Sequence, residues 1–259
     1  MTRAISRGRR AVVAGLVAGL SAVACASQSP AGPRPGRIVI DPGHTPSLGG
    51  ALGVRGVHEV QYNDRLAARL VQALTLAGFE VALTRGPTEN VSLEARAQYA
   101  NARQADLFLA IHHDSAQLQF LEKTKAGDLD AYRTTRPIAG YSIFVSQRNP
   151  RFAESYAFAQ MLGEEMRKLG RAPTLHHAEP IAGESRELLA PDIGIYRFDD
   201  LVVLRQTVMP AVLLEAGVIV DPTDEGYVRD PGNQGRMVHA VVVAVQRYVA
   251  TIRGDYSKK

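Results

Sequence analysis

The chain has 259 residues, which is enough for one sizeable α/β domain with a buried core and terminal tails. Hydrophobic residues make up 46% of the sequence, an ordinary globular value that argues against intrinsic disorder. The net charge of +4 is partly local, because Arg3, Arg7, Arg9 and Arg10 lie at the amino terminus and two lysines end the chain. Without tryptophan and without a basic stripe, the sequence predicts no nucleic-acid partner.

Residues 1–25 are typical of a signal peptide. A basic segment that ends at Arg10 precedes an apolar run from Ala11 to Ala24, and small residues follow. The run is too short for a permanent membrane-spanning anchor, and the alternative is an amphipathic amino-terminal helix. The pattern favours an exported protein of the periplasm or cell envelope.

The only cysteine, Cys25, ends this apolar run in Ala22-Val23-Ala24-Cys25, so no disulfide can form within the chain. The segment resembles a bacterial lipobox, which implies membrane attachment through a lipidated Cys25. It has Ala22 where leucine is usual, so ordinary secretion stays open. Residues 26–36 are rich in proline, glycine and serine and predict a flexible linker, which places the folded domain at 37–259.

Predicted strands and helices alternate from Arg37 onward. This order predicts a mostly parallel, twisted sheet with helices on both faces. Two less regular segments, 115–140 and 171–200, are interpreted as insertions near one rim. The expected strands are 37–41, 80–84, 106–112, 141–146, 211–218 and a short one at 202–205, and the expected helices are 59–77, 92–103, 152–169 and 235–252.

Four polar residues stand at or near the ends of predicted strands and at the start of a helix. His44 follows the first strand, His112 ends the third, Glu215 lies inside a late apolar strand, and Glu59 opens the first helix. Sites of open α/β sheets form at the carboxyl ends of strands, so the topology would gather these residues. Two imidazoles and one carboxylate form a catalytic zinc set. A carboxylate in the apolar surroundings of Glu215 is costly without a metal, a cation or a proton.

Each residue taken alone has a simpler explanation. His44 is equally explained as a turn residue after Pro-Gly, and Glu59 as an acidic residue favoured at a helix amino terminus. Glu215 is equally explained by pairing with a buried arginine such as Arg205. Side chains alternate along a strand, so only one of the two histidines that end the third strand can face the site.

The segments together resemble the zinc-dependent N-acetylmuramoyl-L-alanine amidases of the cell-wall hydrolase type (amidase type 3). The shared motifs are collinear and lie between residues 37 and 253. They are Asp41-Pro42-Gly43-His44, Gly56-Val57-His58-Glu59 with Asn63, Thr84-Arg85, Ser92-Leu93-Glu94-Ala95-Arg96, Ala100-Asn101, Ala105-Asp106-Leu107-Phe108 through Ile111-His112, and Pro210-Ala211-Val212-Leu213-Leu214-Glu215.

This resemblance implies that His44, Glu59 and His112 bind zinc (Zn2+) and that Glu215 is the catalytic carboxylate. It favours Glu59 over the neighbouring His58, and His112 over the next residue. It also implies a peptidoglycan substrate, in which zinc-activated water cleaves the amide bond between N-acetylmuramic acid and L-alanine of the stem peptide.

The residues around the site depart from the family pattern. His113-Asp114 stands where a small residue and asparagine are usual, and Asp221-Pro222 lies in a segment where Ser-Asn is usual. These changes concern substrate preference more than chemistry, and we expect Asp114 and Arg205 to contact substrate. The pair His176 and His177 has no counterpart in the family and is expected at the surface.

Two other functions share the same motifs. One is a zinc peptidase acting within the stem peptide, and the other is a non-catalytic wall-binding or regulatory module. Loss of a ligand or of Glu215 would have favoured the module, and all four residues are present. Related enzymes sometimes carry an inhibitory insertion, so residues 116–140 or 171–200 are candidates for a lid. A protein activator is a further partner that the resemblance suggests.

Overall fold

A computed structural model describes Met1 and residues 35–254, and the residues from Pro35 onward form one compact unit. The predicted signal peptide beyond Met1, Cys25 and the linker up to residue 34 lie outside the described residues. Within the described part, no helix combines the length and the apolar character needed to cross a membrane.

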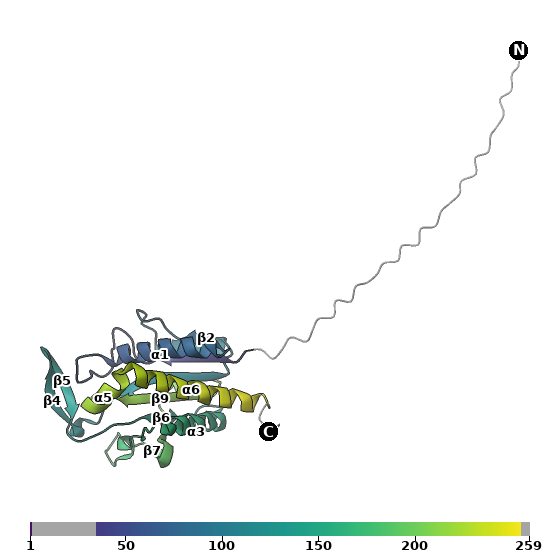
Figure 1. The fold of residues 1–259 in the computed structure, drawn as a ribbon. Coiled ribbons are helices and arrows are strands. Elements are labelled where there is room, and N and C mark those ends of the chain that lie inside the picture. Colours follow the sequence, from purple (N-terminus) through teal and green to yellow (C-terminus); the bar gives the residue numbers. More distant parts are fainter. Residues whose placement is uncertain (2–34, 255–259) are drawn as a thin grey trace. The chain divides into compact units, whose positions relative to one another are not determined.

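The core of this unit is a seven-stranded sheet with the order β2-β1-β3-β9-β6-β8-β7 (Figure 1). Strands β2, β1, β3 and β9 run parallel, β6 is antiparallel to β9, β8 is parallel to β6, and β7 closes the edge antiparallel to β8. The mostly parallel sheet is therefore confirmed. The strands are β1 Arg37–Pro42, β2 Glu80–Leu83, β3 Leu107–Asp114, β6 Ser142–Val145, β7 Glu187–Ala190, β8 Ile195–Arg197 and β9 Ala211–Val218.

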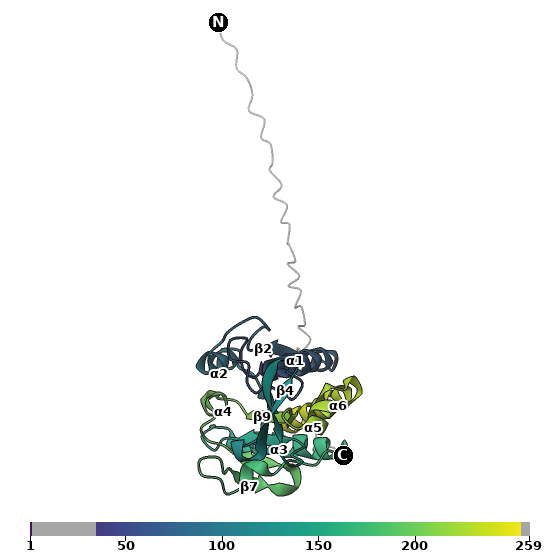
Figure 2. The same ribbon diagram turned by 90° about the vertical axis from the view of Figure 1, so that its left-hand side faces the viewer.

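Helices cover both faces of the sheet (Figure 2). One face packs against α1 (Glu59–Leu76), α3 (Phe152–Lys168), α5 (Pro222–Arg229) and α6 (Pro231–Ile252), and the other against α2 (Leu93–Ala102) and α4 (Val202–Gln206). Alternation along β3 separates the two cores, because Leu109 joins the first and Phe108 the second. The same alternation decides which side of the sheet each polar residue at the strand end faces.

Local signals account for several helix ends. The Ser92 hydroxyl accepts a hydrogen bond from the Ala95 backbone N–H and so caps the start of α2. Helix α1 ends where Gly78 adopts a φ of +89°, a left-handed conformation that costs glycine little. Ser92 therefore sets the start of α2, and Gly78 sets the end of α1.

The segment 202–205 was expected as a strand and is the helix α4. A short apolar run such as Val202-Val203-Leu204 does not distinguish a strand from a buried helical turn by its pattern. Here α4 packs against α2 and β9 and buries Val203 and Leu204. Tertiary packing therefore decides the conformation of this run.

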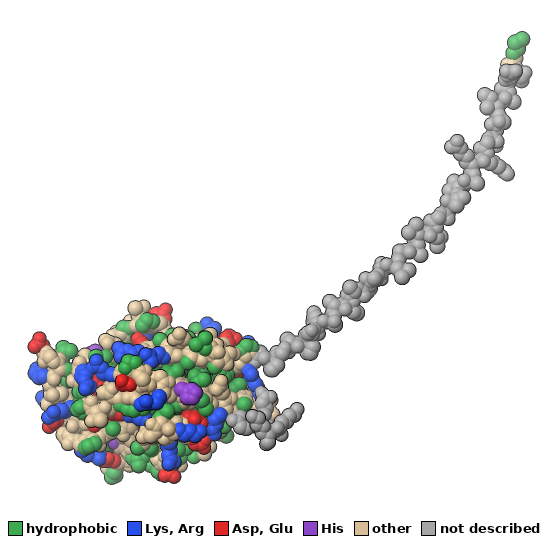
Figure 3. All heavy atoms as spheres, viewed as in Figure 1, with side chains coloured by type: hydrophobic (Ala, Val, Ile, Leu, Met, Phe, Trp, Pro, Cys, Tyr) green, Lys and Arg blue, Asp and Glu red, His purple; other side chains and the backbone are tan. Residues whose placement is uncertain are grey.

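The two irregular segments also contain more structure than expected. Residues 115–140 hold the antiparallel hairpin of β4 (Leu121–Ala126) and β5 (Leu129–Thr134), which pair only with each other. Residues 171–200 contribute β7 and β8 to the main sheet, so they are not a simple insertion. The face drawn in Figure 3 carries Lys and Arg side chains interspersed with Asp and Glu. Three 3-10 helices complete the fold at Leu118–Phe120, His176–Ala178 and Pro191–Ile193.

Candidate metal centre

Three of the predicted site residues converge at the carboxyl ends of β1 and β3. His44 Nε2 lies 2.8 Å from Glu59 Oε2, and His112 Nδ1 lies 2.9 Å from Glu59 Oε1. One ligand atom from each residue fits within a group whose members are all within 4.8 Å of one another. The side chain of His44 is 33% exposed whereas that of Glu59 is 6% exposed, so the group is anchored from inside and open on one side.

Two glycines let the backbone approach these side chains. A Cβ on Gly43 would lie 2.3 Å from the His112 ring, and a Cβ on Gly50 would lie 2.5 Å from Glu59 Oε2. His44 itself has a φ of 62°, which is strained for a residue with a side chain. The surrounding loop must therefore hold this conformation against its intrinsic cost.

Two buried arginines supply that support. The Arg85 Nε donates to the His44 carbonyl at 2.8 Å, and the Arg96 guanidinium donates to the same carbonyl. Arg96 is itself fixed by an ion pair with Asp41 at 2.9 Å. These arginines belong to the Thr-Arg and Ser-Leu-x-x-Arg motifs, but their role as supports of the His44 loop was not evident from the sequence.

The electrostatics of Glu59 suit a metal ligand. Burial by itself raises the pKa of Glu59, but hydrogen bonds from His112 and His44 outweigh it and hold the pKa well below its usual range. Asn63 Nδ2 donates to Glu59 Oε1 at 3.1 Å, and the His113 backbone N–H donates to the same oxygen at 3.2 Å. Glu59 is therefore an ionised carboxylate with both oxygens oriented.

The histidines next to the group are excluded by geometry. His113 is buried, and its Nδ1 lies 2.8 Å from Asn63 Oδ1 on the α1 side of the sheet. Burial lowers the pKa of His113 to about 3, so it is neutral near pH 7. His58 is exposed at the start of α1 and makes no side-chain cap hydrogen bond there. Neither residue belongs to the group that could hold a metal.

Glu215 lies beside this group on the neighbouring strand. Its backbone is in register with His112 where β3 pairs with β9. Its Oε2 is buried and has no hydrogen-bond partner among the residues that the structure describes. Burial raises the pKa of Glu215 well above its usual value, and the charges of Asp114 and Glu59 add to this effect. Glu215 Oε2 is therefore free to accept a proton or a hydrogen bond from a bound ligand.

Asp114 and Arg205, which the sequence predicts to contact substrate, lie in different surroundings. Asp114 Oδ2 lies 2.6 Å from His177 Nε2 and 3.5 Å from His176 Nε2, so the two histidines are part of the site region and not a surface pair. His176 is buried. Arg205 lies on α4, and no ion pair or hydrogen bond joins its side chain to Glu215 within the described chain.

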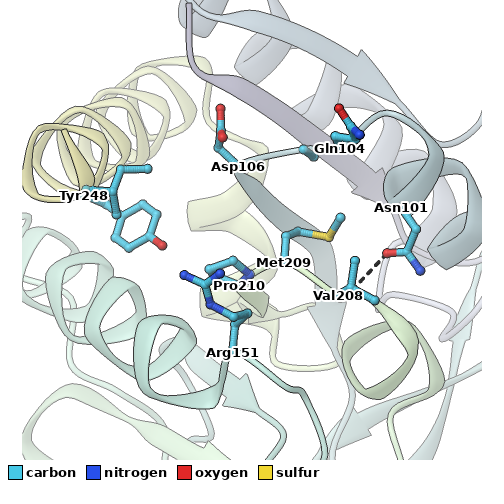
Figure 4. A pocket seen from close by; sticks show the side chains of 10 residues that line it. Asn101, Gln104, Asp106, Arg151, Val208, Met209, Pro210 and Tyr248 are labelled. Carbon is cyan, nitrogen blue, oxygen red and sulfur yellow. Dashed lines mark hydrogen bonds between the residues drawn. The ribbon is translucent and has the colours of Figure 1, made fainter.

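A separate cavity lies at the amino ends of the strands, away from this group. Its volume is about 270 Å³, and it is lined by residues that precede β3 and β9, including Asn101 and Val208, and by Tyr248 of α6 (Figure 4). The Asn101 side chain accepts a hydrogen bond from the Val208 backbone N–H at 2.9 Å. No group of described residues that could hold a metal adjoins this cavity, so the candidate metal centre lies at the carboxyl ends of the strands instead.

The donor set fits a metal ion. Two imidazole nitrogens and one carboxylate oxygen are the ligands of catalytic zinc sites, which keep a further position open. A buried carboxylate beside such a set is the usual partner for water activation. Fold and site together therefore define an α/β protein with the arrangement of a metal-dependent hydrolase.

The family model of N-acetylmuramoyl-L-alanine amidases (Amidase_3) matches residues 38–247, and the chain belongs to this family. The amidase AmiC of Neisseria meningitidis serogroup B is 23% identical over 249 residues, which cover 85% of this chain and 56% of AmiC. The probable cell wall amidase LytH of Staphylococcus aureus is 29% identical over 213 residues, covering 82% of this chain and 57% of LytH. The chain thus spans little more than half the length of these relatives.

Solved structures support the fold. The CwlD amidase of Clostridioides difficile, whose structure is in complex with the GerS lipoprotein, has a TM-score of 0.62 and 17% identity. The match covers 83% of this chain and 99% of that one. At this identity the likeness concerns the α/β fold alone.

Proposed function

We propose that the chain is an exported, zinc-dependent N-acetylmuramoyl-L-alanine amidase that acts on peptidoglycan. The observation that carries the proposal is the half-buried Glu215 side chain beside the group of His44, Glu59 and His112, because its buried Oε2 has no hydrogen-bond partner among the described residues. Membership of the amidase family points to the bond between N-acetylmuramic acid and L-alanine of the stem peptide.

The roles of the residues follow from their positions. His44, Glu59 and His112 would hold zinc, which when bound polarises a carbonyl oxygen and lowers the pKa of water. Glu215 takes the proton of the attacking water at its free oxygen and returns it to the departing amine nitrogen of L-alanine.

The decisive experiment replaces Glu215 by glutamine, with Glu94→Gln on the exposed side of α2 as the matched control. We expect Glu215→Gln to abolish peptide release from purified peptidoglycan while the bound zinc content stays unchanged. The control should match the wild type in both measurements. Near-normal lytic activity of Glu215→Gln would remove this residue from the catalytic role.

Product analysis separates the proposed reaction from its alternatives. Mass spectrometry of digested peptidoglycan should show intact stem peptides if the chain is an amidase, whereas shortened stems would identify a zinc peptidase. A non-catalytic module would bind peptidoglycan without releasing either product. Removal of zinc with a chelator should stop release, and zinc add-back should restore it.

The envelope location completes the proposal. We place the mature chain in the periplasm or cell envelope, held at the membrane by a lipid on Cys25. Labelling of cells with a radioactive fatty acid should mark the wild-type chain and spare Cys25→Ala. If both chains stay unlabelled yet are processed and exported, the protein is secreted freely.

An accessory activator is the remaining part. CwlD binds a lipoprotein in its solved structure, and by analogy we propose a protein that raises the activity of this chain.

An inhibitory lid at residues 171–200 would have to exclude β7 and β8, because these strands belong to the main sheet. The hairpin β4–β5 is the segment whose strands pair only with each other, so a two-glycine replacement of residues 122–133 is the cleaner test. Raised basal activity would identify a lid, and unchanged activity would exclude one there.

A further inference from the structure

A second group of metal-binding side chains lies beside Glu215. Asp114 at the end of β3 and the pair His176 and His177 offer one ligand atom each, all within 4.8 Å of one another. His177 Nε2 lies 2.6 Å from Asp114 Oδ2, and His176 Nε2 lies 3.5 Å from the same oxygen. Both imidazoles therefore direct their Nε2 atoms toward the Asp114 carboxylate.

Hydrogen bonds among the described residues leave one member of this group, His176, unsatisfied. The side chain of His176 is only 2% exposed, and its Nε2 has no hydrogen-bond partner among the described residues. Its other nitrogen, Nδ1, lies 2.7 Å from the Thr174 hydroxyl oxygen. If Nδ1 carries the proton, the Nε2 lone pair faces a carboxylate oxygen, and two acceptors repel. If Nε2 carries it, a buried donor has its only acceptor beyond good hydrogen-bond distance.

A cation between the three side chains resolves both cases. The Nδ1–H of His176 then donates to Thr174, as metal-bound histidines usually donate through their second nitrogen. Burial lowers the pKa of His176 to about 4, which keeps the imidazole in the neutral form that metals bind. Gln117 Nε2 donates to the His176 carbonyl at 3.1 Å and holds the short helix in place.

The surroundings of the group leave access for a cation. A cavity of about 180 Å³ is lined by Asp114, His176, His177 and the exposed Glu184. His177 and Glu184 also line a neighbouring cavity of about 140 Å³ that contains Glu215. A cation held by Asp114 and the two histidines would therefore lie next to the proposed catalytic carboxylate.

We propose that Asp114, His176 and His177 form a second site for a divalent transition-metal ion, separate from the site of His44, Glu59 and His112. Two imidazoles and one carboxylate select zinc or a cation of similar ligand preference over calcium and magnesium, which prefer oxygen ligands. The site does not depend on the proposed amidase reaction, because its evidence is the donor geometry alone.

The test measures zinc in the purified full chain after stripping with a chelator, reloading and removal of free metal. We expect about two zinc ions per wild-type chain by mass spectrometry of the metal. Asp114→Asn, His177→Ala and His44→Ala should each retain about one, and the His44→Ala/His177→Ala double variant about none. His239→Ala, which removes an exposed histidine from α6, is the matched control and should retain two.

A second measurement avoids substitutions in the new group. Cobalt added to the His44→Ala chain should still give the visible absorption of a tetrahedral site with histidine ligands. The proposal is overturned if this band is absent, or if the wild type binds a single zinc ion that Asp114→Asn leaves in place. A second zinc ion that persists in both Asp114→Asn and His177→Ala would also overturn it, because that ion would lie elsewhere.

Discussion

Replacing Asn63 by alanine tests whether this buried residue orients Glu59 for a metal. Asn63 is fully buried on α1, one turn after Glu59. Its amide donates to Glu59 Oε1 at 3.1 Å and to the Gly43 carbonyl at 3.3 Å. Its oxygen lies 2.8 Å from His113 Nδ1, so that nitrogen must carry a proton.

Two separate losses are expected. Without Asn63 the buried Nδ1–H of His113 has no acceptor, which costs about 1–3 kcal/mol of stability. For a domain of this size that lowers the melting temperature by roughly 2–4 °C per kcal/mol. Glu59 also loses a supporting donor, and such losses weaken metal binding by about 10–100-fold.

Thermal unfolding with and without zinc separates the two losses. In chelator, Asn63→Ala should lose only the first amount, whereas with zinc in excess the loss should grow by about 1.4–2.7 kcal/mol, the free energy of a 10–100-fold change. Asn101→Ala is the matched control, because this asparagine makes hydrogen bonds at the opposite edge of the sheet. It should lower the melting temperature equally in both conditions. A folded Asn63→Ala chain with wild-type zinc affinity would refute the orienting role.

Three further predictions concern other contacts. Gly43→Ala places a Cβ 2.3 Å from the His112 ring and should weaken zinc binding by about 10–100-fold. Gly235→Ala on α6, with open space around it, should instead stabilise the fold by about 0.5–1 kcal/mol. Equal zinc affinities of the two variants in a titration would contradict this. Arg171→Met leaves Asp224 buried without its ion partner and should cost about 3–5 kcal/mol in urea unfolding, and an unchanged unfolding midpoint would refute this. Chelation of the wild type should lower its stability, and zinc at about 100 times its dissociation constant should restore about 2.7 kcal/mol for each site that it fills. A melting temperature that does not change with zinc would rule this out.

The sequence predicted the central strands because their signals are local and strong. Residues 211–218 form β9 within the bounds expected from an unbroken apolar run. The convergence of His44, Glu59 and His112 follows from the parallel order of β1 and β3, which brings their carboxyl ends to one edge. A motif-based expectation worked here because the chain connectivity itself gathers the residues.

Other features depend on contacts that no local pattern encodes. His177 meets Asp114 across 63 residues of sequence, from a 3-10 helix in a segment with no regular periodicity. Strands β7 and β8 have four and three residues, too few for alternation to be recognised. For Arg205 the sequence suggested an ion pair with Glu215, but Arg205 itself lies on α4, which packs on α2.

Glu59 and Glu215 are in opposite electrostatic states, and the proposed metal would act on both. Glu59 is kept ionised by the hydrogen bonds of two histidines, while burial and the charges of Asp114 and Glu59 raise the pKa of Glu215. A bound cation offsets the negative charge of Glu59 and so removes part of the opposition to ionised Glu215. A cation on Asp114 acts in the same direction from the other side. A metal held by His44, Glu59 and His112 would therefore favour the ionised form of Glu215 that the proposed reaction needs, and a chain stripped of metal should hold Glu215 in its protonated form.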